Sequence, residues 1–420
     1  MTGGLTIVSA DDHLVEPPHV FVDRVPARLR DRAPRIVTDD EGHELWEFDG
    51  RRHAQIGLNA VVGRPKDAWS MDPARFDEMR PGCFDPDARI ADMDLDGVWA
   101  SLCFPSLIAG FAGTMFAGLP EPELGLACIR AWNDWHVEEW VGSHPDRFIA
   151  VQLPWLDDPV VAADEVRRNA ERGVRAVSFV ENPVDLGLPS VHTSHWDPFL
   201  AACEETGTVV CLHCASSGWS ASHSPGAPLE QLTTLFPVNA LVTCADWLWA
   251  GIPTRFPGLR ITLAESGVDW VPMLVNRIAY VLDHSATGLG AWTDPHRHPN
   301  EALRDTFRFG TIDVTPTVAA LLDQIGVETI LLESDYPHAD STWPETVARA
   351  ERGLAGLPDD VVRAITWGNA AALFDHPVPA HLQVPAPAAD PNGEPHRGGD
   401  REQPLDPNPA SEPERSTHGR

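Results

Sequence analysis

The stretch Thr6-Ile7-Val8-Ser9-Ala10-Asp11-Asp12-His13 is a short apolar run that ends in ionisable side chains. Similar runs recur along the chain, and each is typically followed by a stretch with helical character. The eight runs are Thr6–Ala10, Val98–Phe104, Phe148–Leu153, Arg175–Val180, Thr208–Cys214, Arg260–Ala264, Arg308–Ile312 and Thr329–Leu332. Because strands that alternate with helices form a mostly parallel sheet, eight such units predict an α/β fold, a (β/α)8 TIM barrel. A doubly wound open sheet is the alternative architecture.

The helical character is clearest over residues 159–172. There Val160, Ala163, Val166 and Ala170 recur at the spacing of one helix face, against charged residues on the other. Such a period predicts an amphipathic helix that packs its apolar face on the sheet.

Two segments do not fit the alternation. Residues 14–97 separate the first strand from the second, far more than one helix needs, and we expect this insertion either to cover the barrel mouth as a lid or to stabilise the flank. Residues 377–420 are rich in Pro, Gly and charged residues and poor in large apolar ones, which predicts a disordered tail. The sequence therefore predicts one barrel domain over residues 1–376.

Composition excludes several classes of function. The chain of 420 residues has 62 acidic and 31 basic residues and a net charge of −31. A field of that sign repels phosphate backbones and anionic lipids, so we expect neither a nucleic acid nor a membrane as partner, but a small molecule. The one lysine, Lys66, follows Gly63-Arg64-Pro65 and lacks the setting of a P-loop.

Cysteine usage points to a reducing compartment. The seven cysteines are an odd number and are scattered through predicted strands and helices, unlike a disulfide framework. The start Met1-Thr2-Gly3-Gly4 shows no basic segment followed by an apolar one, as a signal peptide would. We therefore expect the protein in the cytoplasm. The Cys211-Leu212-His213-Cys214 spacing has no second cysteine pair, so buried strand cysteines are the better interpretation than a structural zinc site.

Polar and ionisable side chains end nearly every predicted strand. They are Asp11-Asp12-His13, Glu181-Asn182, His213, Glu265, Asp313 and, after the eighth strand, Glu333-Ser334-Asp335-Tyr336-Pro337-His338. Barrel enzymes place their chemistry at these carboxyl ends, where the strand ends converge. Since ionisable groups are costly there unless they are paired or coordinated, the coincidence predicts a functional site.

A divalent metal ion would explain four of these groups. Asp11 and His13 are two residues apart and so project from the same side of an extended strand, and His213 and Asp335 are expected to converge with them. Two imidazoles and two carboxylates suit Zn²⁺, and the oxygen share also suits Mn²⁺ or Fe²⁺. We expect one such ion, with coordination positions open to water or substrate.

The chain resembles the amidohydrolase superfamily, in its amidohydrolase-related branch that includes aminocarboxymuconate-semialdehyde decarboxylase and the resorcylate-type decarboxylases. The resemblance spans roughly residues 7–374 and rests on an ordered set of motifs. These are Ser9-Ala10-Asp11-Asp12-His13-Leu14-Val15-Glu16-Pro17, Asp92-Met93-Asp94-Leu95-Asp96-Gly97-Val98, His195-Trp196-Asp197-Pro198, Val210-Cys211-Leu212-His213, Phe256-Pro257-Gly258-Leu259-Arg260, Glu333-Ser334-Asp335-Tyr336-Pro337-His338 and Asn369-Ala370-Ala371-Ala372-Leu373-Phe374.

The resemblance implies that Asp11, His13, His213 and Asp335 are the metal ligands. The chain departs from the family in three places. The first motif is Asp-x-His where His-x-His is usual, Glu265 stands where the family has a catalytic histidine, and Glu181 stands where binuclear members have a carboxylated lysine. The last departure favours a single metal ion. Glu265 could do acid–base work if burial raises its pKa toward neutrality.

Four further residues are candidates for binding substrate or supporting the ligands: Glu16, Glu181, His338 and Arg277. Two mechanisms stay open. Asp335 accepts a proton from metal-bound water in a hydrolase, whereas Asp335 or Glu265 delivers a proton to carbon in a non-oxidative decarboxylase. The resemblance favours the decarboxylase, acting on a small organic acid or cyclic carbonyl compound, and implies a homodimer. The competing class is an inactive barrel that binds a ligand or acts as a scaffold.

Overall fold

The structure is a computed structural model. It describes residues 4–383 apart from 58, 67–74, 223, 225, 285–291, 293 and 295. Among these residues, no helix is long and apolar enough to cross a membrane.

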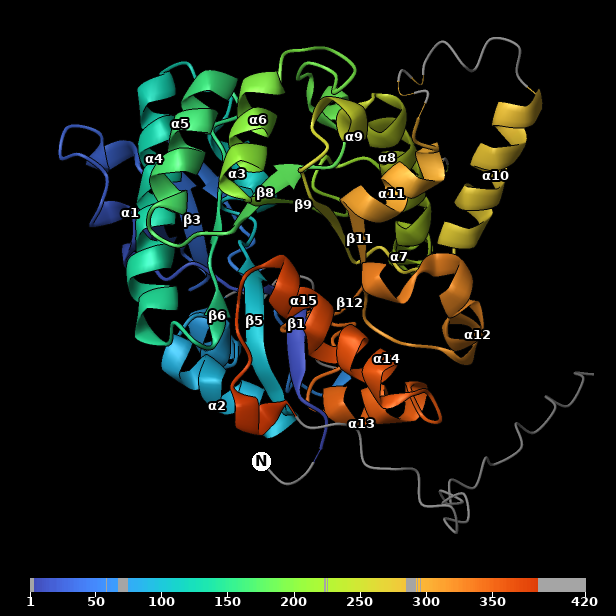
Figure 1. The fold of residues 1–420 in the computed structure, drawn as a ribbon. Coiled ribbons are helices and arrows are strands. Elements are labelled where there is room, and N and C mark those ends of the chain that lie inside the picture. Colours follow the sequence, from blue (N-terminus) through green and yellow to red (C-terminus); the bar gives the residue numbers. More distant parts are fainter. Residues whose placement is uncertain are drawn as a thin grey trace, which may run out of the picture. The chain divides into compact units, whose positions relative to one another are not determined.

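Parallel strands form the barrel at the centre of the domain (Figure 1). They are β1 (Ile7–His13), β5 (Val98–Phe104), β6 (Phe148–Ile149) with β7 (Val151–Gln152), β8 (Ala176–Val180), β9 (Val209–His213), β10 (Ile261–Ala264), β11 (Phe307–Thr311) and β12 (Ile330–Leu332). Their order is β1-β5-β6 in one sheet and β7-β8-β9-β10-β11-β12 in the other, and only Ala150 separates β6 from β7. The eight predicted strands are thus confirmed.

The last strand returns to the first. Just beyond β12, the Asp335 amide donates to the Asp11 carbonyl at 3.0 Å, and the His13 amide donates to the Tyr336 carbonyl at 2.6 Å. These bonds tie the end of the last strand to the first strand, as the predicted barrel requires and the alternative open sheet does not. The same bonds bring the chain's two predicted ligand segments together.

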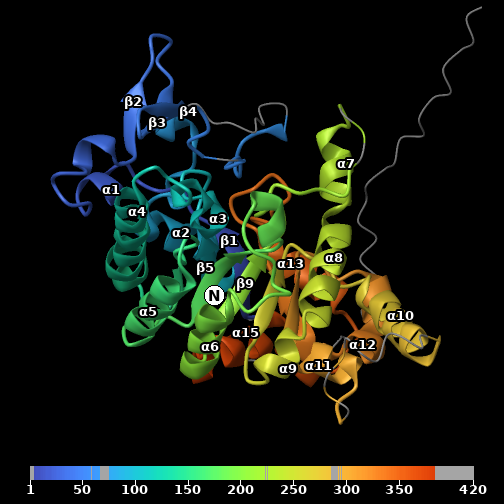
Figure 2. The same cartoon turned by 90° about the horizontal axis from the view of Figure 1, so that it is seen from above.

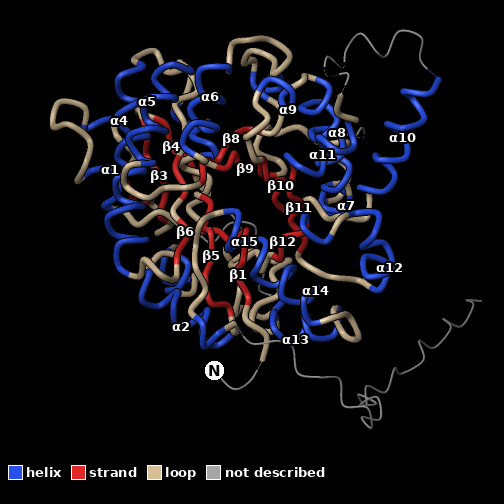
Figure 3. Tube along the Cα trace, viewed as in Figure 1, coloured by secondary structure: helices blue, strands red, loops and turns tan. Residues whose placement is uncertain are grey.

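Helices cover the outside of the strands (Figure 3). The longer ones are α2 (Pro86–Asp96), α4 (Pro122–Trp135), α5 (Pro159–Ala170), α6 (Asp197–Thr206), α8 (Phe236–Trp249), α10 (Val271–His284) and α12 (Pro316–Ile325). With helices outside and side chains filling the barrel inside, β1, β5, β8, β9, β10 and β12 are buried along their whole length.

Helix α5 confirms the helix expected over residues 159–172. It begins where the Asp158 carboxylate accepts from the Val160 amide at 2.8 Å, and proline occupies the first turn. The buried face includes Ala163 and Val166 as expected, but Val160 is 55% exposed. Val160, in the first turn of the helix, therefore faces solvent.

The insertion after β1 has two parts. Strands β2 (Arg35–Thr38), β3 (Glu44–Phe48) and β4 (Arg51–His53) form a small antiparallel sheet on the side of α1 (His19–Val22) and α4 (Figure 2). Further along, the amides of Val61 and Val62 donate to the Pro337 carbonyl at 3.0 and 3.1 Å. The insertion therefore packs on the flank and also contributes to the wall of the barrel mouth. Residues 58 and 67–74 of the insertion lie outside the described residues.

The predicted tail begins with an ordered segment. Val378 and Leu382 are buried, and the Thr6 hydroxyl donates to the Leu382 carbonyl at 2.6 Å. Residues 377–383 thus pack on the barrel, and the rest of the predicted tail, residues 384–420, lies outside the described residues.

Candidate metal centre at the barrel mouth

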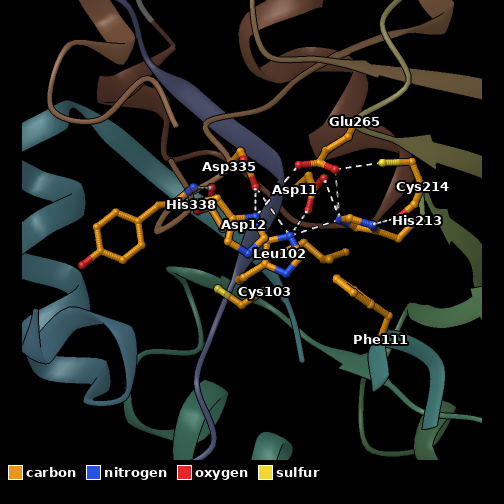
Figure 4. A network of polar contacts seen from close by, with 12 residues as sticks. Asp11, Asp12, Leu102, Cys103, Phe111, His213, Cys214, Glu265, Asp335 and His338 are labelled. Carbon is orange, nitrogen blue, oxygen red and sulfur yellow. Dashed lines mark hydrogen bonds and ion pairs between the residues drawn. The ribbon is translucent and has the colours of Figure 1, made fainter. Parts of the chain in front are cut away.

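Four predicted ligands converge at the carboxyl end of the barrel (Figure 4). His13 Nε2 lies 3.0 Å from His213 Nε2 and 3.5 Å from both Asp11 Oδ1 and Asp335 Oδ1. His213 Nε2 lies 3.5 Å from Asp11 Oδ2. All four side chains are buried. The structure therefore brings together one carboxylate and one imidazole from β1, one imidazole from β9, and one carboxylate from the turn after β12.

These donors fit a divalent metal ion. Four ligand atoms at about 2.0–2.2 Å from a tetrahedral ion are separated from one another by about 3.3–3.6 Å, close to the 3.0–3.5 Å spacings here. Both carboxylate oxygens of Asp11 are buried without a hydrogen bond from the described residues. Those of Asp335 likewise accept no well-aligned one, although His338 Nδ1 lies 2.9 Å from Oδ1. Buried carboxylate oxygens without donors are what a bound cation would satisfy.

The number of buried carboxyl groups in the site also favours a bound cation. Burial, followed by the charges of Glu333, Glu265 and Asp335, raises the pKa of Asp11 well above its ordinary value. Burial and the neighbouring Glu265 raise the pKa of Asp335 in the same way. Several carboxyl groups thus repel one another in a site from which water is excluded. A dipositive ion would remove that repulsion.

Both histidines are in the form that binds metals. Burial, together with His338 and His213, lowers the pKa of His13 well below its ordinary value, and burial lowers that of His213. His213 Nδ1 lies 2.7 Å from the carbonyl of Cys214 and therefore carries the hydrogen, as we assign it. The lone pair is then on Nε2, which faces His13 and Asp11.

Asp12 holds the two ligand segments in place. Because side chains alternate along a strand, it points away from Asp11 and His13. Its carboxylate accepts from the Tyr336 amide and from three hydroxyl groups, those of Ser9, Ser101 and Ser334. These donors belong to β1, β5 and the turn after β12, so one buried carboxylate ties together three strand ends.

The side chain of Arg89, in α2, contacts both ligand segments. It is fully buried, and its guanidinium donates to the carbonyls of His13 and Gly82. It also stacks over the ring of Tyr336, 4.1 Å from the centroid. The helix that ends the insertion is thereby fastened to the backbone on either side of the metal site.

The backbone turns sharply at two site residues. Glu265 and Asp335 have φ values of 51° and 54°, in the left-handed region that non-glycine residues rarely adopt. Glu265 directly follows β10 and Asp335 lies three residues beyond the end of β12, and the turn at each residue directs its side chain into the barrel mouth. Unfavourable backbone conformations of this kind persist where the surroundings enforce them, and they cluster at functional sites.

Glu265 lies beside the four ligands. Its Oε2 accepts from the Cys214 thiol at 2.8 Å, and its Oε1 lies 3.9 Å from His338 Nδ1. Burial by itself would raise the pKa of Glu265, but the nearby His338 and His213 outweigh burial and lower the pKa to about 2. The raised pKa that acid–base work by Glu265 would require is therefore not found, and the lowered pKa favours its ionised form.

The other predicted residues occupy different places. His338 is at the mouth, with its ring stacked on that of His13 at 3.9 Å. Glu16 is buried behind the pocket, where Ser106 and the indole of Trp132 donate to it. The Ser217 hydroxyl donates to Glu181 at 3.1 Å, and burial raises the pKa of Glu181 to about 7.

Arg277 does not join the site. It is exposed on α10, with its guanidinium 5.0 Å from the centroid of the Tyr280 ring. Asp313, which we placed at the end of the seventh strand, is also exposed. Both side chains are solvated at the surface of the protein, so neither gains free energy by turning toward the barrel mouth.

Two site residues were missed from the sequence. Cys214 follows His213 directly and reaches Glu265, and Phe111 stacks on His213 with ring centroids 4.6 Å apart. The signal for Phe111 is the pair of glycines around it, in Ala109-Gly110-Phe111-Ala112-Gly113, just after the second barrel strand.

A small cavity adjoins the ligands. It has a volume of about 10 Å³ and is lined by His13, Leu14, Val15, Ala60, Pro105, Ser106, Phe111, Pro337 and His338. A wider cleft of about 830 Å³ lies on the other side of His338, between residues 62–66 and 338–345. His338 therefore separates the interior of the site from an open approach.

Comparison with known proteins agrees with this geometry. The family model described as amidohydrolase matches residues 34–376. The gamma-resorcylate decarboxylase of Rhodococcus jostii is 26% identical over 291 residues, which cover 62% of this chain and 80% of that protein.

Two solved structures share the fold. An amidohydrolase from Mycobacterium avium subsp. paratuberculosis superposes with a TM-score of 0.71 at 24% identity, over 88% of this chain and 99% of that one. A dihydroxybenzoic acid decarboxylase from Polaromonas sp., which holds manganese and the inhibitor 2-nitroresorcinol, has a TM-score of 0.53 at 17% identity, over 88% and 97% of the two chains.

Proposed function

The chain belongs to the amidohydrolase family and is a metal-dependent enzyme of that superfamily, and from this premise we propose that it catalyses a non-oxidative decarboxylation. The substrate class is a small organic acid with a hydroxyl or oxo group beside its carboxylate. The relative from Rhodococcus jostii and the Polaromonas structure are decarboxylases of such acids by name, which supports this choice over hydrolysis.

The observation that carries the proposal is the convergence of two carboxylates and two neutral imidazoles on one side of a small cavity. Asp11, His13, His213 and Asp335 would hold one divalent ion, Zn²⁺ in the first place or alternatively Mn²⁺ or Fe²⁺. When bound, the ion would polarise the substrate's carboxylate and its neighbouring oxygen as a Lewis acid. The spacing of the donors makes an inactive barrel the less favoured alternative.

The protein's own groups supply the proton. Decarboxylation breaks the bond between the carboxylate and the adjacent carbon, which keeps the electron pair and takes up one proton as CO2 leaves. Asp335 is the donor in our assignment, because it lies beside His338, which can pass it a proton. His338, with Nδ1 2.9 Å from Asp335 and its side chain also lining the outer cleft, returns a proton from solvent.

Glu265 has a different role from Asp335 and His338 in this proposal. Glu265 is an ionised carboxylate that accepts a hydrogen bond from the Cys214 thiol. Its negative charge stabilises the positive charge on His338 while His338 transfers the proton. In this arrangement a glutamate works where the family has a histidine.

The test is a metal analysis followed by a substrate panel. Protein reconstituted with Zn²⁺ or Mn²⁺ is offered 2-hydroxybenzoate, 2,6-dihydroxybenzoate and 3-hydroxybenzoate, together with a lactone and an aryl ester, and both CO2 release and ring opening are followed. We expect about one equivalent of metal and CO2 release from an acid with a neighbouring hydroxyl group, but not from 3-hydroxybenzoate. Hydrolysis of the lactone or ester without CO2 release would reject decarboxylation.

The matched variants are Asp335→Asn and Asp313→Asn. Both exchange the same groups at a strand end, but only Asp335 lies in the site. We expect at least about a hundredfold loss of activity in the first variant, typical of a lost general acid, and none in the second.

A further inference from the structure

Phe111 occupies the side of the metal site that is not taken by the ligands. Its ring lies nearly parallel to that of His213, with centroids 4.6 Å apart and planes inclined by 25°. It also meets the ring of His13 edge-on at 5.5 Å. Figure 4 shows the ring below His213, on the side away from Glu265. One side chain thus covers both predicted imidazole ligands.

The cavity beside this ring is too small for a substrate. Its volume of about 10 Å³ holds about one water molecule, whereas sites for organic ligands typically have about 300 Å³ or more. A hydroxybenzoate fits into this cavity only if part of its wall moves.

Most of the wall is fixed. Leu14 and Val15 are buried, Pro105 and Pro337 are rigid, and Ala60 and Ser106 have small side chains. His13 and His338 belong to the site itself. Phe111 is the large side chain of this wall that is only partly buried, and its movement would open the most space.

The backbone of Phe111 is strained in its present position. Its φ of 54° and ψ of −53° correspond to the γ-turn with positive φ, a rare conformation for a residue with a side chain. Gly110 and Gly113 have φ values of 62° and 78°, which glycine adopts without cost. The Phe111 carbonyl accepts from the Ser178 hydroxyl at 2.7 Å, a bond that holds the strained turn against β8. Movement of residues 110–113 would relieve this strain.

We propose that Phe111 is the specificity-determining gate of the site: its ring occupies the place of a planar, unsaturated carboxylic acid against the imidazole of His213 and leaves when such a substrate enters. The inference rests on the proposed function and names its substrate class more closely. A planar substrate replaces the ring–ring contact with His213 by an equivalent one, whereas a saturated, puckered acid does not.

The test measures binding without turnover. The metal-loaded enzyme is mixed in a stopped-flow instrument with 4-nitrocatechol, a planar chelator whose visible absorption changes when it binds a metal ion. In the wild type, the observed rate levels off with rising 4-nitrocatechol concentration, because opening of the gate becomes limiting. In Phe111→Ala the rate keeps rising and is about tenfold higher at the highest concentration.

Two further variants control the result. Leu107→Ala removes a side chain from the same loop but not from the cavity wall, and it should behave as the wild type does. Phe111→Leu keeps bulk without a flat ring, and it should still level off while the preference for 4-nitrocatechol over the saturated chelator cis-1,2-cyclohexanediol falls. Metal content by mass spectrometry should equal that of the wild type in every variant.

The outcomes separate this proposal from the proposed function. A linear rate in the wild type that Phe111→Ala does not change would overturn the gate and leave the metal site intact. Absence of binding to wild type and Phe111→Ala alike, with metal present, would overturn both, since no open coordination position would then exist.

Discussion

The Nε2 atoms of His13 and His213 lie 3.0 Å apart, although 200 residues separate the two histidines in the chain. Each is the last residue of a barrel strand, β1 in one case and β9 in the other. Two imidazole nitrogens that point at one another, with buried carboxylates 3.5 Å away, are arranged so that one cation could bind both rings and the carboxylates. This relationship underlies the following predictions.

Replacement of Asp11 by asparagine should separate stability from metal binding. The metal-free protein should become more stable, because one of several mutually repelling buried carboxyl groups is neutralised. Affinity for Zn²⁺ or Mn²⁺ should fall at least about tenfold, since a charged ligand is lost. Thermal unfolding with and without metal, together with titration calorimetry, measures both effects. A variant that loses stability without metal would contradict the like-charge argument.

Loss of Arg89 should destabilise the fold by about 3–5 kcal/mol, typical of a broken buried charge network. Arg89→Ala leaves the His13 carbonyl without its donor and opens a space beside Tyr336. Urea unfolding of the metal-free protein measures the change in free energy of unfolding. Arg277→Gln is the control, because that arginine is exposed on α10, and it should stay within about 0.5 kcal/mol of the wild type.

Glu181→Gln should stabilise the protein in a pH-dependent way. The folded-state pKa of about 7 lies above the ordinary value of 4.5, so between these pH values the folded protein keeps a proton that the unfolded chain has lost. Stability contributed by the protonated carboxyl group is therefore lost as pH rises through this window. The variant should gain little near pH 4.5 and about 1–3 kcal/mol at pH 8.

The measurement is urea unfolding of both proteins from pH 4.5 to 8. Glu171→Gln, a change at an exposed carboxyl group just after α5, serves as control and should differ from wild type by less than about 0.5 kcal/mol throughout. A gain for Glu181→Gln that is equal at pH 4.5 and pH 8 would show that burial does not perturb this carboxyl group.

Cys214 should act through Glu265 and not as a metal ligand. Cys214→Ala removes the donor to Glu265 Oε2, and we expect kcat to fall about tenfold because a hydrogen bond to a charged group is lost. Cys214→Ser keeps a donor and should retain most of the activity. Metal content should stay at the wild-type value in both variants. Loss of metal from either one would instead make the sulfur a ligand.

Convergence of the candidate residues could be predicted from the sequence where a residue's position along a strand decides its direction. Asp11 and His13 are two apart and point the same way, and His213 ends a buried run of apolar residues. The prediction failed for Arg277, because helical spacing does not tell whether a long polar side chain turns toward the barrel mouth or into solvent. The sequence alone could not decide the pKa of Glu265, because the partners that lower it, His338 and His213, belong to other strand ends.

The sequence by itself determined the barrel, its eight strands and the residue types at the strand ends, because apolar periodicity and strand-end chemistry are local properties of the chain. Only the tertiary structure decided which side chains close the site and which of its groups carry charge. Three features each depend on atoms from strands far apart in sequence. They are the strained turn at Phe111, the hydrogen bond from the Cys214 thiol to Glu265, and the hydrogen bonds around Asp12. Such contacts follow from the packing of the whole barrel, and that packing is not encoded in any short stretch of the chain.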